Sequence, residues 1–166
     1  ATTPDAYLYP EYDDVLRRAM LAETRLLFRH LIEENLSNGN LIDSDFTFLN
    51  RKLAEHYGIE GVEGEEMRKV ALDKDSVRGG ILAHASIAKV TANGTVTTPV
   101  KRGSFVLTNL LGLPPSPPPP GVGSIEPDTR GATTIRETLE KHQSVESCAA
   151  CHRRIDPPGF ALECFD

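Results

Sequence analysis

The chain has 166 residues, which is enough for one domain, or a domain with an appendage, that buries a hydrophobic core. Apolar residues make up 39% and charged residues 25%, as is ordinary for a globular protein, and the net charge of −6 argues against a nucleic-acid-binding surface. No apolar run approaches the ~20 residues of a membrane-spanning helix, and the N-terminal residues lack the basic start and apolar middle of a secretion signal. The chain ends on the apolar "FALECFD", so we expect it to be a piece of a longer protein.

Residues 11–36 predict one long amphipathic helix. Leucines and a methionine recur at helical spacing, with acidic and basic residues between them. Pro10 stands at its start, where a missing N–H is tolerated, and Gly39 follows its end.

Residues 43–57 predict a second helix. Asp43 or Ser44 is the expected N-cap, and Gly58 should end the helix. Apolar side chains within this segment fall on one helical face.

Residues 78–113 allow two interpretations. An Asn-Gly pair between runs rich in Val, Thr and Ile is typical of a β-hairpin. We favour helix, turn and helix, with the second helix opened by Pro99 and closed by Gly112.

A proline-rich segment at residues 113–131 predicts a strap or linker. Six of seven consecutive residues are proline, which enforces polyproline II geometry at ~3.1 Å per residue. A ligand for a proline-binding module is the alternative to a stiff strap. The strap separates a helical domain, residues 1–112, from a C-terminal segment, residues 132–166.

That C-terminal segment begins with a predicted helix. Thr133 or Thr134 should cap it, and Glu137 completes a capping box with Thr134. We expect residues 157–159, Pro-Pro-Gly, to stop any helix that continues past the cysteine motif "CAACH".

The cysteine motif carries the functional prediction. All three cysteines lie in the last nineteen residues, whereas a disulfide-stapled domain would distribute an even number along its length. Cys148, Cys151 and His152 form Cys-x-x-Cys-His, the attachment signal for a covalent c-type haem. Both thiols add across the haem vinyl groups, and the imidazole becomes the proximal iron ligand.

Two other chemistries use this spacing. Cys148, Cys151, His152 and Cys164 have the ligand types of a zinc site, but neighbouring residues rarely both reach one tetrahedral ion. A thioredoxin-type dithiol needs a βαβ pattern, which is not visible here. We therefore favour haem.

The residues after the motif suit a haem site. A proximal histidine donates its other ring N–H to an acceptor, and we expect a backbone carbonyl within residues 156–158 to accept from His152. Arg153 and Arg154 can pair with haem propionates, and residues 160–162 can supply an apolar wall.

The second axial ligand is open. The fourteen residues after His152 contain no Met or His, so the ligand must come from upstream, from another chain, or be absent. His142 is the first distal candidate and His56 the second, with a structural histidine as the alternative for each. We expect His84 and Met20 to be core residues. The remaining candidates, expected at the surface, are His30 and Met67.

The ordered motifs "LAEHYGIEGVEG", "RGGILAHASI", "TTPVKRGSFVLTNLLG", "PPPPGV" and "TIRETLEKHQSVESCAACHRRIDPPGFALECFD" resemble the cytochrome-c-like domains of large multi-domain planctomycete-type proteins. The resemblance runs from about residue 13 to the end and implies further domains in the whole protein. It implies export, hence a periplasmic location, because such haem is attached outside the cytoplasmic membrane. The family's haem residues correspond to Cys148, Cys151 and His152, its preceding histidine to His142, and its His-Tyr-Gly to residues 56–58. Relatives often have Asn where this chain has Cys164, whose role we do not assign.

The expected fold is therefore mainly α, with a helical domain, a proline-rich strap and a short C-terminal cytochrome-c-like haem-binding unit. The expected function is one-electron transfer by a single haem c to or from a redox partner protein or fused domain, without nucleic acid and without a membrane span. The alternatives are a peroxidase-type haem enzyme, with His56 or Arg102 as distal group, and a zinc-stabilised binding module.

Overall fold

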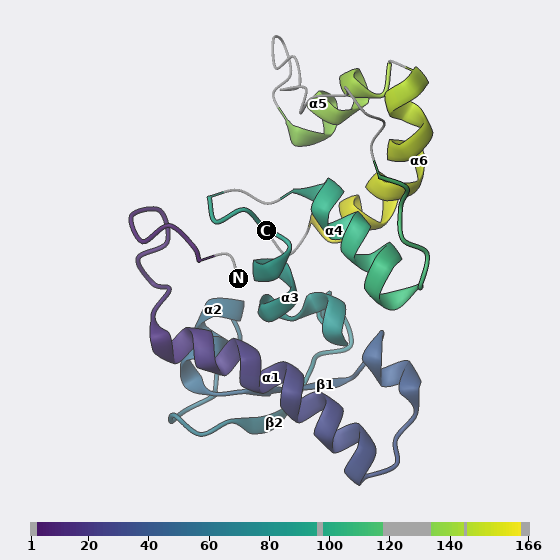
Figure 1. The fold of residues 1–166 in the computed structure, drawn as a ribbon. Coiled ribbons are helices and arrows are strands. Elements are labelled where there is room, and N and C mark those ends of the chain that lie inside the picture. Colours follow the sequence, from purple (N-terminus) through teal and green to yellow (C-terminus); the bar gives the residue numbers. More distant parts are fainter. Residues whose placement is uncertain (1–2, 96–97, 118–133, 145, 164–166) are drawn as a thin grey trace. The chain divides into compact units, whose positions relative to one another are not determined.

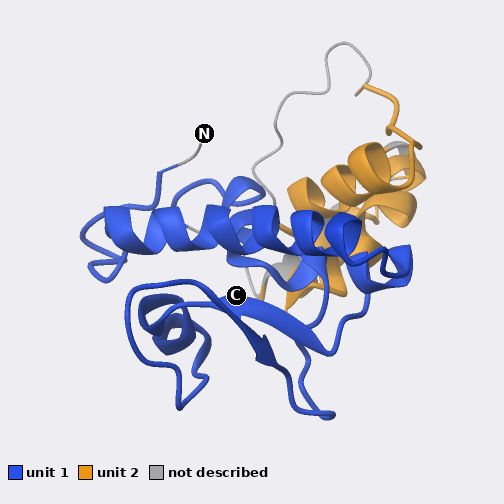
Figure 2. Cartoon of the chain, turned by 90° about the horizontal axis from the view of Figure 1, so that it is seen from below, with its two compact units in different colours: residues 1–97, 164–166 blue, residues 98–163 orange. Residues whose placement is uncertain are grey.

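The computed structural model describes residues 3–95, 98–117, 134–144 and 146–163. The chain divides into two compact units, which Figure 2 draws in different colours, and Figure 1 labels its helices and strands. Within the described chain, unit 1 runs to residue 95 and unit 2 covers 98–163. Most of the predicted strap, from residue 118 on, lies outside the described residues. Residues 98–112 belong with the C-terminal segment.

Helices dominate both units, which confirms the mainly α class. The elements of unit 1 are α1 (Asp14–Glu33), η1 (Asn38–Leu41), β1 (Phe46–Leu49), α2 (Arg51–Tyr57), β2 (Arg68–Ala71), η2 (Ile81–Ala83) and α3 (Ala85–Val90). Those of unit 2 are α4 (Pro99–Phe105), the π-helix η3 (Val106–Leu110), α5 (Ile135–His142) and α6 (Glu146–Phe160).

The long first helix is confirmed, with each end three residues inside the predicted range. Asp13 caps α1 by accepting a hydrogen bond from the Leu16 N–H at 2.8 Å. The buried side of α1 packs on α2 and β1, and together they make the core of unit 1. The core residues are Leu16, Ala19, Met20, Leu49, Leu53, Ala54, Val62 and Ala85.

The first half of the second predicted helix is wrong. Phe46–Leu49 is the strand β1, buried along its length, and it pairs antiparallel with β2. Thr47 lies opposite Val70 in this two-stranded sheet. The apolar run of β1 is compatible with either state, and its partner strand lies too far along the chain to influence the local pattern.

The second half of that prediction holds as α2. Asn50 is its N-cap and accepts from the Leu53 N–H at 3.0 Å, so the cap is neither Asp43 nor Ser44. Gly58 ends α2 in the left-handed conformation, at φ +68°, as expected.

Both helices expected within residues 78–113 are present as α3 and α4, and the described part of that segment contains no strand. Pro99 is in the first turn of α4, and η3 continues it to a left-handed Gly112 at φ +66°. Thr134 caps α5, and its reciprocal bonds with Glu137 confirm the predicted capping box.

Two glycines let α4 and α6 approach backbone to backbone. A Cβ on Gly103 would lie 1.7 Å from the Ile155 carbonyl oxygen, and one on Gly159 would lie 1.9 Å from the Pro99 carbonyl oxygen. Both distances are far inside van der Waals contact, so this crossing requires glycine on each helix.

The prediction that residues 157–159 stop the motif helix is wrong. α6 continues through Pro157 and Pro158 to Phe160, and the Ala161 N–H still bonds to the Pro157 carbonyl at 3.1 Å. The two prolines remove N–H groups that would bond to carbonyls one turn earlier, on residues whose side chains are solvent-exposed. Water can serve those carbonyls, and packing against α4 favours the continued helix.

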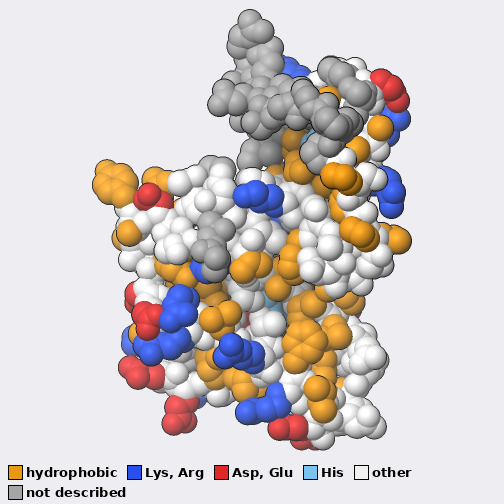
Figure 3. Space-filling model, in the orientation of Figure 1, with side chains coloured by type: hydrophobic (Ala, Val, Ile, Leu, Met, Phe, Trp, Pro, Cys, Tyr) orange, Lys and Arg blue, Asp and Glu red, His pale blue; other side chains and the backbone are white. Residues whose placement is uncertain are grey.

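The exposed surface of unit 1 is mixed. In Figure 3, basic and acidic side chains lie interspersed on the face drawn, with hydrophobic side chains among them. Ile32 and Ile42 are exposed apolar residues of unit 1. Within the described residues, no helix combines the length and apolar character needed to cross a membrane.

Candidate haem-attachment site

The cysteine motif lies in the first two turns of α6. Cys148 and Cys151 are one helical turn apart, which places their side chains on the same side of the helix, and His152 follows directly. Neither thiol is in a disulfide. Cys148 is buried, whereas Cys151 and His152 are half-buried.

A buried carboxylate orients His152. The Nδ1 atom of His152 lies 3.0 and 3.1 Å from the two carboxylate oxygens of Asp156, one turn later on α6. Asp156 is only 1% exposed, and its Oδ2 also accepts from Gln143 Nε2 at 2.8 Å. The acceptor within residues 156–158 is thus the Asp156 side chain. The prediction that a backbone carbonyl accepts from His152 is wrong.

The sequence contained the signal for this contact. His152 and Asp156 are four residues apart, which places them on one face of a helix. Sequence patterns alone do not predict the contact, because Pro157 and Pro158 predict that the helix ends at this point.

The residues present fit a covalently held haem. Two free thiols and an imidazole are gathered on one stretch of helix, and the bond between His152 Nδ1 and Asp156 favours the tautomer in which Nε2 would be the ligating nitrogen. No cluster of three or more His, Cys, Asp or Glu suited to a metal occurs among the described residues. The zinc alternative includes Cys164, which lies outside that part of the chain.

The residues proposed to surround the haem have other contacts. Arg153 pairs with Glu146 at 3.3 Å on the exposed side of α6, and Arg154 is exposed. The Arg136 guanidinium lies over the Phe160 ring, 4.1 Å from its centroid.

Arg102, proposed as a distal group, is buried in unit 2, and its Nη1 donates to the Leu162 carbonyl at 2.9 Å. Arg102 therefore links α4 to the residues that follow α6.

The distal candidates fall in both units. His142 is the last residue of α5, and its side chain lies outside the description. His56 is exposed at the end of α2 in unit 1, with its ring 5.8 Å from that of Tyr57. Met20 and His84 are buried as expected, whereas His30 and Met67 are half-buried rather than on the surface.

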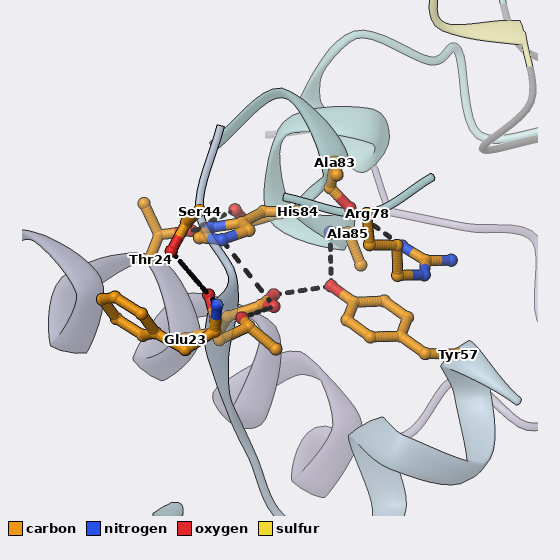
Figure 4. A network of polar contacts seen from close by, with 11 residues as sticks. Glu23, Thr24, Ser44, Tyr57, Arg78, Ala83, His84 and Ala85 are labelled. Carbon is orange, nitrogen blue, oxygen red and sulfur yellow. Dashed lines mark hydrogen bonds and ion pairs between the residues drawn. The ribbon is translucent and has the colours of Figure 1, made fainter. Parts of the chain in front are cut away.

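A second polar cluster lies buried in unit 1 (Figure 4). The Glu23 carboxyl group accepts from Tyr57 OH at 2.5 Å and from Thr47 OH at 2.7 Å. His84 Nε2 lies 3.8 Å from Glu23 Oε1, and its Nδ1 is 2.9 Å from Thr24 Oγ1. Sequence patterns did not single out Glu23, although its spacing from the buried leucines places it on the core face of α1.

Burial controls the protonation of this cluster. It raises the pKa of Glu23 to about 7 and lowers the pKa of His84 to about 4, because each charged form loses hydration. Arg78 stacks on the Tyr57 ring at 3.7 Å and donates to the Ala83 carbonyl. The adjoining cavity has room for about one water molecule. The cluster therefore joins α1, β1, α2 and α3 as a hydrogen-bonded core and offers no room for a substrate.

Two protein-family models match the chain. Residues 78–166, more than half of it, match the family model PSCyt3, described as a protein of unknown function (DUF1588). The chain belongs to the PSCyt3 family. Residues 1–59 match a second model, PSD4, described as a protein of unknown function (DUF1592). No curated protein and no solved structure matches the chain.

The PSCyt3 match contains the whole cysteine motif, the α4–α6 crossing and α3 with His84. PSCyt3 and PSD4 are planctomycete-type cytochrome-like domain families, which agrees with the resemblance seen in the sequence. The PSD4 match contains α1, β1 and α2, including Glu23 and Tyr57 of the buried cluster.

Proposed function

We propose that this PSCyt3 chain is a mono-haem c-type cytochrome domain that transfers single electrons to or from a fused or partner redox enzyme. The observation that carries the proposal is the arrangement on α6, where two free thiols lie one turn apart and the adjacent His152 is held by Asp156. When bound, a haem supplies the one-electron redox chemistry.

The chain's own residues have three roles in this proposal. Cys148 and Cys151 form the two thioether links, which keep the group attached through repeated oxidation and reduction. His152 ligates through Nε2, and Asp156 holds its ring in place. Haem of this kind is attached outside the cytoplasm, so the proposal includes export to the periplasm.

A redox titration of the chain matured in a bacterial periplasm tests electron transfer. We expect a six-coordinate, low-spin absorption spectrum in both oxidation states and a single one-electron transition. A high-spin spectrum with rapid reaction toward peroxide would instead support the haem enzyme, since an open iron position permits such chemistry. A colourless protein that contains stoichiometric zinc would support the binding module and refute the proposal.

Replacing His56 and His142 separately by alanine tests the second axial ligand. Loss of the low-spin spectrum in one variant, and not in the other, identifies the ligand. Retention of that spectrum in both variants would assign the sixth position to neither histidine.

A further inference from the structure

The contact between His152 and Asp156 fixes more than a ring orientation. The two Asp156 oxygens lie 3.0 and 3.1 Å from His152 Nδ1, and carboxylate oxygens accept hydrogen bonds, so this geometry favours the tautomer with its proton on Nδ1. Nε2 then carries the ring lone pair, which is the tautomer that a metal-binding imidazole needs.

The carboxylate is held from two helices. Asp156 is on α6, whereas Gln143, whose Nε2 donates to Oδ2 at 2.8 Å, directly follows α5. A carboxylate that is 1% exposed costs stability unless it is hydrogen-bonded, and these two bonds offset that cost. Its negative charge is poorly screened, so it acts strongly on the imidazole beside it.

We propose that Asp156 is a positioning residue that makes His152 a strongly electron-donating ligand and so stabilises ferric over ferrous iron. The inference rests on the proposed function. The reaction it biases is the uptake of one electron from the redox partner by ferric iron, with no other bond formed or broken. A carboxylate that accepts from the imidazole N–H shifts electron density toward the ligating nitrogen, and a nearby negative charge disfavours the added electron.

The test variant removes the charge of the Asp156 side chain and keeps its shape. Asp156→Asn retains an oxygen that can accept from His152 but removes the negative charge. Glu146→Gln is the matched control, because it removes one carboxylate charge from the exposed side of the same helix. Each protein is matured with haem in the full chain, its haem is verified by intact mass, and its reduction potential is measured.

We expect Asp156→Asn to shift the ferric–ferrous equilibrium about tenfold toward ferrous iron, a rise of ~59 mV for one electron. The control should remain close to the wild-type potential. A purely structural role for Asp156 would leave the potential of Asp156→Asn equal to that of the control, and this result would overturn the inference.

A second variant decides the matter if Asp156→Asn does not fold or load haem. Gln143→Met removes the other donor to the carboxylate, so the bond from His152 should strengthen and the potential should fall. An unchanged or higher potential would overturn the inference. Wild-type protein without a haem mass would refute the proposed function and this inference together, whereas loaded proteins of equal potential would refute the inference alone.

Discussion

Replacing either Glu23 or His84 of the buried pair should make the free energy of unfolding depend on pH. The intact pair should contribute no such dependence in the same range. Burial raises the pKa of Glu23 from 4.5 to about 7 and lowers that of His84 from 6.5 to about 4. Between pH 4.5 and 6.5 the folded pair therefore holds one proton, on the carboxyl group. The unfolded pair also holds one proton in this range, on the imidazole, so the pair contributes no slope.

Each single variant removes one of the two compensating groups, so the titration of the remaining group determines how stability depends on pH. In Glu23→Gln, His84 stays neutral in the folded protein while the unfolded imidazole is protonated below pH 6.5. Unfolding then takes up a proton, and the free energy of unfolding should rise with pH from about 4 to 6.5. In His84→Gln, Glu23 stays protonated in the folded protein while the unfolded carboxyl group ionises above pH 4.5, so stability should fall as pH rises toward 7.

The size of each slope follows from the pKa shifts. One proton changes the free energy of unfolding by ~1.4 kcal/mol per pH unit, so either variant should vary by about 3 kcal/mol across its range. Both groups are almost fully buried, at 1% and 3% exposure, so solvent screening should not reduce this value greatly.

Urea unfolding followed by tyrosine fluorescence measures the effect. All four tyrosines lie in unit 1 and the chain has no tryptophan, so this signal reports on unit 1. Opposite slopes in the two variants and a flatter wild type are the expected result. Three parallel pH profiles would refute the assignment of one shared proton to the pair.

Three further substitutions test the packing that positions the motif and the core. Gly103→Ala should destabilise unit 2 by about 3 kcal/mol or more, because the new methyl group would overlap the Ile155 carbonyl; loss of amide protection in α4 and α6 by hydrogen exchange measures it. Tyr57→Phe should cost unit 1 about 2–3 kcal/mol in urea unfolding, because Glu23 loses a donor and the Ala85 N–H loses its acceptor. Asn50→Ala should cost about 1–2 kcal/mol through loss of the α2 cap.

One further residue in each unit provides a control. Ser104→Ala, next to Gly103 on α4, should leave the exchange of unit 2 unchanged. Tyr12→Phe should leave unit 1 close to the wild-type stability. Wild-type stability in Gly103→Ala would contradict the close crossing of α4 and α6.

The predicted elements that formed as expected are those specified by nearby residues. α1 has its N-cap and buried stripe within one continuous segment, and α5 has a capping box formed by Thr134 and Glu137. The end of α2 follows from Gly58, which adopts a left-handed conformation readily.

The failures involve partners distant in the chain. β1 is a strand because β2 pairs with it, and α6 passes through its prolines where Gly103 and Gly159 allow α4 to pack closely. Local periodicity does not contain either contact.

The candidate site also has one part that nearby residues predict and one part that depends on the fold. The spacing of Cys148, Cys151 and His152 predicts their haem role from the sequence alone, and that role stays a prediction. The role of Asp156 depended on the helix continuing, so it emerged only from the fold.

Intact mass of the periplasmically matured chain tests the central claim most directly. Wild-type protein should carry the mass increment of one haem that survives denaturation, and Cys148→Ser/Cys151→Ser should carry none. Cys164→Ser, which leaves the motif intact, should retain the increment. A wild-type chain at the mass of its polypeptide alone, after maturation that loads a known c-type cytochrome in parallel, would contradict the account.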